Sequence, residues 1–358
     1  MRLERMIRKL LPGLLGATVL VLASCEKEPP TRVSSGALES ALRGRPIESG
    51  GSNEAVRFSG EATGLRATVL GSTTTLSQAG PIPSSGGADE ASLLTATVPG
   101  TLTARVLHAS TIGQGDRSRS EASAADLDLT VAGQSVRASF LMARAEAICT
   151  NGGPQTRGSS EIANLVINGT PVTVSGSPNQ TIVLPAGAGR VVINEQSGSP
   201  GSIRVTALHV VVTGVADVIV ASAHADIACQ GRPSCVGGDF VTGGGWITGT
   251  PSGAKGTFGV AGGIKNGSFW GHLTYIDHGP GGPKVKGTGV TAYTSTGPTS
   301  RRIEGTCTID GAGGSYRVDV ADNGEPGRSD TFDLRLSNGY HASGALGGGN
   351  IQLHMPCR

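Results

Sequence analysis

Short runs in which apolar or β-branched residues alternate with polar ones fill the chain from residue 55 to residue 229. Runs such as TPVTVSG and SIRVTALHVVVTG have the two-residue period of a strand with one buried face. Turn sequences rich in Asn, Gly, Pro and Ser separate the runs at short intervals. This pattern is typical of antiparallel strands in a β-sandwich, and no window has the period of a long helix.

Composition and the placement of aromatic residues extend this prediction to the whole chain. Glycine accounts for 57 of 358 residues and only 16% are charged, which favours turns and small side chains over helices. Only Phe58 and Phe140 among the aromatic residues precede residue 230, so two cores of different composition are expected. We predict an all-β fold of two antiparallel β-sandwich or barrel-like domains, residues 55–229 and 239–358, joined by a linker at 230–238.

The N-terminus has the organisation of a secretory signal. Arg2, Arg5, Arg8 and Lys9 precede an apolar stretch at residues 10–22. About 13 apolar residues are too few for a helix to cross about 30 Å of hydrocarbon, so a cleaved signal is expected rather than a membrane span.

The segment Leu22-Ala23-Ser24-Cys25 follows this stretch and resembles the lipobox of bacterial lipoproteins. The resemblance implies a signal peptide at residues 1–24, cleavage before Cys25 and covalent lipid on its sulfur. Because Glu26 rather than Asp follows the cysteine, it also implies the outer membrane more than the inner one. The alternative is an ordinary secretory signal with an incidental cysteine.

Residues 25–54 are expected to be the lipidated cysteine and a flexible tether, because they are polar, contain Pro, Gly and Ser, and show no apolar periodicity. The whole chain has 29 Lys and Arg and 27 Asp and Glu, and the signal removes more basic than acidic residues. The mature chain is therefore close to neutral and has no basic run, which excludes nucleic acid as an expected partner.

Several ordered segments of the first domain resemble a family of bacterial surface proteins. These are SGEATGLRATV, IANLVINGTPVTVSGSPNQTIVLPAGAGRVVINEQ and IRVTALHVVVTGVADVIVASAHADIAC, which together span about residues 55–229. They are similar to the choice-of-anchor P family, in which an exported domain is joined to differing envelope anchors. The segment from 239 to 358, beginning DFVTGGGWI, resembles the β domain that often follows such modules. The resemblance implies surface display and brings no catalytic residues.

Five cysteines remain after the lipidated one, and an exported chain meets an oxidising compartment. Cys149 and Cys229 each end a strand in which small residues occupy alternate positions, so these strands can approach closely enough for a disulfide. Cys235 and Cys357 flank the second domain and can pair with each other, which leaves Cys307 as a buried thiol. The rival pairing joins Cys307 to Cys357 and leaves Cys235 free.

One acidic turn could bind a metal. In the sequence DVADNGEPGRSD, the side chains of Asp322, Asn323, Glu325 and Asp330 crowd oxygen ligands into a glycine-containing turn, as a Ca²⁺ site needs. The spacing does not match an EF-hand. The alternative is a strand-connecting turn whose acids are solvated.

The sequence gives little indication of a histidine metal site or of a known catalytic motif. His272 and His278 would lie on the same face of one strand, near Asp277. A separation of six strand residues puts them about 20 Å apart, which is too far for both to bind one ion. The sequence contains no HExxH, GxSxG, CxxC or Walker A motif.

The expected function is that of a lipid-anchored envelope protein displaying two non-enzymatic β domains as a structural, adhesive or ligand-binding component. Its partners would be the membrane and a carbohydrate or protein ligand. One alternative is a calcium-assisted carbohydrate or matrix binder. A second is an extracellular hydrolase, which would need a cleft holding a Ser or a carboxylate pair with a strongly shifted pKa.

Overall fold

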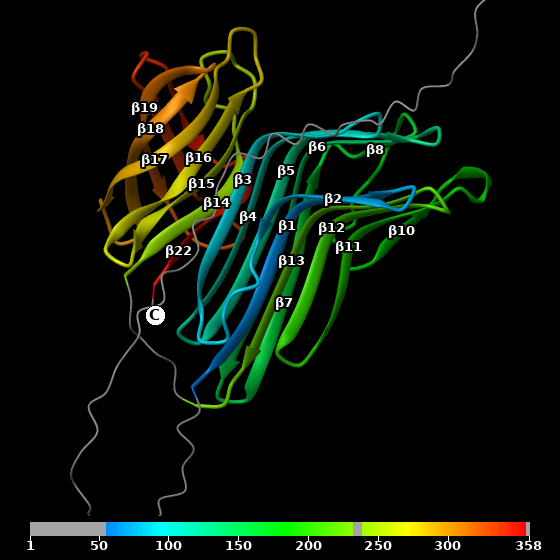
Figure 1. Cartoon of the computed structure of the whole chain (residues 1–358), viewed down its shortest axis with the longest axis horizontal. Coiled ribbons are helices and arrows are strands. Elements are labelled where there is room, and N and C mark those ends of the chain that lie inside the picture. Colours follow the sequence, from blue (N-terminus) through cyan, green and yellow to red (C-terminus); the bar gives the residue numbers. More distant parts are fainter. Residues whose placement is uncertain (1–54, 232–237, 356–358) are drawn as a thin grey trace, which may run out of the picture. The chain divides into compact units, whose positions relative to one another are not determined.

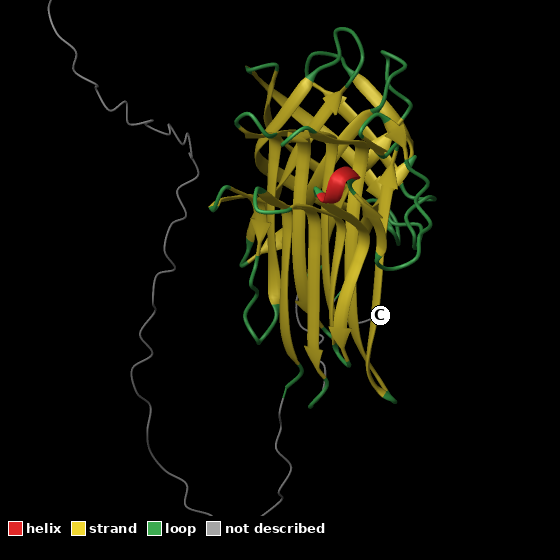
Figure 2. Cartoon of the chain, turned by 90° about the vertical axis from the view of Figure 1, so that its right-hand side faces the viewer, coloured by secondary structure: helices red, strands yellow, loops and turns green. Residues whose placement is uncertain are grey.

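The computed structural model describes residues 55–231 and 238–355, which lie within one compact unit (Figure 1). The signal peptide, Cys25, the tether, Cys235 and Cys357 fall outside the described residues. The described chain forms strands β1–β22 and one short 3-10 turn, η1 (Pro185–Gly187), as Figure 2 shows. The predicted all-β fold is confirmed, and every strand pair is antiparallel.

Two sheets build the part of the chain before residue 230, here called the sandwich. The first sheet has the order β10-β11-β12-β13-β1-β2, and the second has the order β3-β4-β5-β6-β8-β9 with β7 also paired to β6. The strands of the first sheet are β1 (Arg57–Val69), β2 (Ser72–Ala79), β10 (Gln180–Val183), β11 (Gly189–Ser199), β12 (Ser202–Val212) and β13 (Ala216–Ala228). Those of the second are β3 (Gly87–Val98), β4 (Leu102–Gln114), β5 (Arg117–Val131), β6 (Gln134–Thr150), β7 (Gly153–Ala163), β8 (Val166–Ile167) and β9 (Thr170–Pro171).

Small side chains fill the sandwich where β6 of the second sheet packs against β13 of the first. Ala145 and Ala147 on β6 and Ala223 and Ala225 on β13 are all buried. Because alanine occupies little volume, the two sheets can approach closely along these strands without leaving cavities. The alternating alanines that the sequence shows are therefore the facing surfaces of two sheets.

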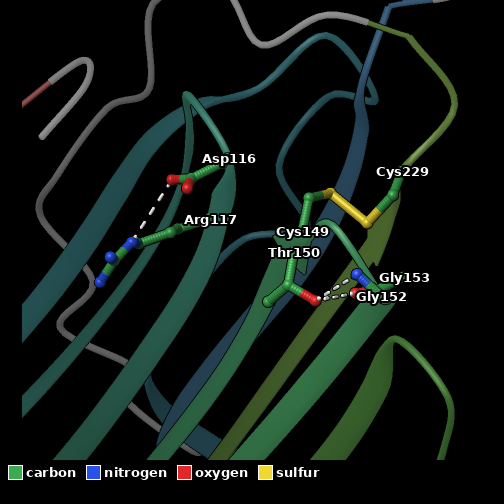
Figure 3. Close-up of a disulfide and its surroundings, with 7 residues drawn as sticks. All are labelled: Asp116, Arg117, Cys149, Thr150, Gly152, Gly153 and Cys229. Carbon is green, nitrogen blue, oxygen red and sulfur yellow. Dashed lines mark hydrogen bonds and ion pairs between the residues drawn. A yellow bond between two sulfur atoms is a disulfide. The ribbon is translucent and has the colours of Figure 1, made fainter.

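The same two strands end in the disulfide that the sequence predicts. Cys149 and Cys229 are bonded, with their Cα atoms 5.5 Å apart, and the bond ties the second sheet to the first (Figure 3). Beside it, the Thr150 hydroxyl donates to the Gly153 carbonyl oxygen at 2.7 Å and accepts a hydrogen bond from the Gly152 amide at 3.2 Å. The turn after Cys149 is thus fixed by local hydrogen bonds.

The remaining strands form a single sheet, here called the C-terminal sheet, in the order β21-β20-β19-β18-β17-β16-β15-β14-β22. Its core contains the aromatic residues concentrated after residue 230, with the rings of Phe258 and Phe332 stacked at 4.0 Å. The strands are β14 (Phe240–Ile247), β15 (Gly256–Lys265), β16 (Ser268–Asp277), β17 (Lys284–Ser295), β18 (Ser300–Ile309), β19 (Ala312–Ala321), β20 (Thr331–Leu336), β21 (His341–Ala345) and β22 (Gly348–His354).

The main apolar clusters lie one on each side of residue 230, and a smaller cluster that includes Phe140 and Ile276 joins them. Strands β14 and β15 are buried on both faces because they lie between the core of the C-terminal sheet and the sandwich. Glycine permits this close approach. A Cβ atom added at Gly244 would lie 2.5 Å from the Ser123 hydroxyl oxygen and 3.5 Å from the His108 ring.

Candidate functional site

A polar cleft lies where the outer face of the second sheet meets β22 and the turn between β19 and β20. It consists of two adjoining cavities of about 350 and 280 Å³ that share Arg117, Arg119 and Glu325. We call this the junction cleft. Its charged lining residues are Asp116, Arg117, Arg119, Glu121, Arg144, Glu146, Arg157, Asp322 and Glu325, and its polar ones include Gln352 and His354.

The sandwich side of the junction cleft is a row of alternating charges across three strands. Strand register places Arg119 of β5 beside Glu146 of β6, and Glu146 beside Arg157 of β7. Arg119 Nε donates to Glu146 Oε1 at 2.8 Å, and Arg117 Nη1 lies 3.5 Å from the same oxygen. Arg157 is exposed and has no hydrogen bond or ion pair with another described residue. Its guanidinium is therefore available to an anionic group.

Glu121, two residues beyond Arg119 on β5, is a buried acid of the cleft, with 2% of its surface exposed. The pKa of Glu121 is raised to about 7, chiefly by burial and also by the Glu325 carboxylate, against the lowering effect of the Arg144 guanidinium. Arg144 Nε lies 4.0 Å from Glu121 Oε1, while its Nη2 pairs with Glu161 at 3.2 Å. The carboxyl group is therefore only partly compensated by a positive charge.

The predicted calcium turn forms the opposite wall, and two of its acids bind backbone. Asp330 is buried and accepts hydrogen bonds from the amides of Asn323 at 2.8 Å and Ile351 at 2.9 Å. Asp322 accepts from the amides of Gly324 and Leu353 at 3.2 and 2.9 Å. Because β22 is an edge strand, these carboxylates satisfy amides that no neighbouring strand reaches.

Glu325 is the only member of that predicted set whose side chain is directed to the polar side chains of β22. Its Oε1 accepts hydrogen bonds from Asn350 Nδ2 at 3.2 Å and Gln352 Nε2 at 2.9 Å. Asn323 instead donates from Nδ2 to the Ser329 carbonyl oxygen. Within the described ranges, no three His, Cys, Asp or Glu side chains come together as metal ligands. Calcium bound by the turn alone stays a prediction.

The histidines of β16 and the loop after it do not meet. His272 pairs with Glu90 and lies 3.3 Å from His108 Nδ1, whereas His278 Nδ1 lies 2.7 Å from Asp126. Burial, with the His272 charge, lowers the pKa of His108 to about 3. This group joins the sandwich to the C-terminal sheet and opens to none of the cavities described above.

A more apolar cavity of about 470 Å³ is lined by Phe58, Phe240, Ile264 and Trp270. It adjoins residues 55 and 238, where the described ranges begin, and has one charged lining side chain, Lys265. The junction cleft holds the convergent charges and is the stronger candidate. Cys307 is a buried free thiol outside both cavities, as one predicted pairing requires.

Sequence reasoning missed Glu121, Arg144, Asn350 and Gln352. The only signal was the presence of charged and amide side chains within otherwise small or apolar strands, such as ARAEA and GNIQLH.

Comparison with protein-family models, curated proteins and solved structures finds no match. Among the described residues, no helix has the length and hydropathy to span a membrane.

Proposed function

We propose that this chain is an envelope-anchored bacterial lipoprotein that binds an anionic surface ligand, such as an acidic carbohydrate, in the junction cleft without transforming it. Export, cleavage before Cys25 and lipid attachment are supported by the N-terminal sequence, and surface display by the resemblance to choice-of-anchor P proteins. Two or more acyl chains would anchor the protein stably, with the outer membrane as the expected site.

The observation that carries ligand binding is the exposed guanidinium of Arg157 at the end of the Arg119–Glu146–Arg157 row. Guanidinium groups bind carboxylates in a bidentate geometry, and the neighbouring arginines add positive charge. Arg119 and Arg144 are already paired with Glu146 and Glu161, which holds their side chains in place. A carboxylate on a ligand would therefore meet a preorganised surface.

The non-enzymatic assignment has its own support. Glu121 and Glu325 form a carboxylate pair, and the pKa of Glu121 is raised to about 7, as an acid–base pair would need. The Asn350 side-chain amide nevertheless donates to both carboxylates, at 2.7 and 3.2 Å, so both acids are engaged by protein rather than directed to a substrate.

Binding is tested with the whole protein in detergent, using a uronic-acid polysaccharide and an uncharged polysaccharide of similar length. We expect the acidic polymer alone to bind, and Arg157→Gln to weaken it about tenfold, equivalent to about 1.4 kcal/mol. Arg190→Gln, at an exposed arginine of β11, is the matched control and should bind normally. Equal binding of the acidic polysaccharide by both arginine variants would show that the junction cleft is not the binding site.

Anchoring is tested separately by labelling growing cells with a radioactive fatty acid. The wild-type protein should incorporate label and fractionate with outer membranes, whereas Cys25→Ala should do neither. Label retained by Cys25→Ala would refute lipid attachment at this cysteine.

A further inference from the structure

Three side-chain oxygens at the junction cleft, two from lining residues and one from the adjacent Asn350, are buried without a hydrogen-bond partner. They are Glu121 Oε2, Asn350 Oδ1 and Gln352 Oε1. Their residues are 2%, 0% and 7% exposed. A buried acceptor without a partner is destabilising because it has lost its hydrogen bonds to water, so three such oxygens close together call for a common cause.

The three residues belong to one cluster that also contains Glu325. Asn350 Nδ2 donates to Glu121 Oε1 at 2.7 Å and to Glu325 Oε1 at 3.2 Å, and Gln352 Nε2 donates to Glu325 Oε1 at 2.9 Å. Two carboxylates are thus held on either side of one neutral amide, although like charges this close repel. The cluster joins β5 of the sandwich to β22 and the turn of the C-terminal sheet.

We propose that this cluster is a binding site for a divalent cation, Ca²⁺, with Glu121, Glu325, Asn350 and Gln352 as its protein ligands. Rotation of the two side-chain amides by 180° would turn their oxygens toward the carboxylates and supply four oxygen ligands. Ca²⁺ accepts six to eight oxygens in flexible geometry. The cavity of about 350 Å³, lined by Glu121, Glu325 and Gln352, gives access from solvent and room for water ligands.

The charges of the site fit a divalent ion. Two carboxylates balance a 2+ charge. Four arginines line the same cavity, but Arg117 and Arg119 pair with Glu146, and Arg144 pairs with Glu161 and donates to the Gly349 carbonyl oxygen. Arg157 lies on β7, two strands from Glu121. The site differs from the turn that the sequence indicates, because Asp322 and Asp330 are engaged with the backbone of β22. Bound Ca²⁺ would link the sandwich to the C-terminal sheet. This inference does not depend on the anionic ligand.

The test measures the metal content of the whole protein after dialysis against Ca²⁺, and its melting temperature in EDTA and in millimolar Ca²⁺. We expect one Ca²⁺ per chain and a Ca²⁺-dependent rise in melting temperature, as mass action requires for an ion bound by the folded state. Glu121→Gln and Glu325→Gln should each abolish both effects, while Glu304→Gln on β18 should retain them. Glu121→Gln keeps an oxygen acceptor for Asn350 and should fold, because burial disfavours the charge it removes.

Asp322→Asn distinguishes this site from the acidic turn. It should retain the Ca²⁺ response, with a lower melting temperature in both buffers because a hydrogen bond to β22 is weakened. No Ca²⁺ response in the wild-type protein would overturn the proposal. The four residues would then be only a hydrogen-bonded contact between the sandwich and the C-terminal sheet. A response retained by Glu121→Gln but lost in Asp322→Asn would place the ion in the turn and also overturn it.

Discussion

Removal of the Cys149–Cys229 disulfide should lower the stability of the protein substantially. The bond closes a loop with a sequence separation of 80 residues. In the chain-entropy treatment, a loop of this size restricts the unfolded chain by about 4.5 kcal/mol, near the upper end of the range for native disulfides. With about 2.1 cal/mol/K of unfolding entropy per residue over the described chain, that corresponds to about 7 °C. The shift would reach about 12 °C if the sandwich unfolds by itself.

Calorimetry of the wild-type protein with and without reductant, and of a Cys149→Ala/Cys229→Ala variant, measures this shift. Both cysteines are only partly buried, so the bond is expected to be open to reductant. Cys307→Ala is the matched control, because Cys307 is a buried free thiol and its replacement should leave the response to reductant intact. Unchanged melting temperatures after reduction and in the double variant would refute the loop-entropy reasoning. Two separate transitions would show that the two parts unfold as independent domains.

Three further perturbations test the junction between the two parts and the turn beside it. Gly244→Val should destabilise the protein by about 1–3 kcal/mol in urea titrations, because its Cβ would collide with the Ser123 hydroxyl, and a normal midpoint would contradict this packing. Asp330→Ala leaves the buried amide of Ile351 without an acceptor and should cost about 1–3 kcal/mol, whereas Asp330→Asn should cost less. The folded state resists protonation of His108, whose pKa burial lowers to about 3, while the unfolded chain takes up that proton near pH 6.5. The contribution of His108 to stability is therefore complete above about pH 6.5 and is lost as pH falls toward about 3. A His108→Gln variant should lose less stability than the wild-type protein between pH 7 and pH 4. Equal losses in the two proteins would argue against a neutral buried imidazole.

The amino-acid sequence alone determined the local features of this protein. Alternation with a period of two residues requires strands with one buried face, and the Gly- and Asn-containing turns require them to reverse, so an all-β fold follows from short segments. The phase of the alanines before Cys149 and Cys229 likewise predicted a disulfide that the structure contains.

Tertiary structure decided which faces and side chains meet. The sequence indicated Asp322, Asn323, Glu325 and Asp330 as one ligand set because they are neighbours in the chain, yet the pairing of β22 at a sheet edge directs Asp322 and Asp330 to its backbone. Glu325 instead meets Glu121 through Asn350, although Glu121 and Asn350 are 229 residues apart. Strand period and turn chemistry act over a few residues, whereas the partner of an outward-facing side chain depends on which sheets pack together. That packing depends on the burial of apolar surface over the whole chain, so no short segment reveals the junction cleft.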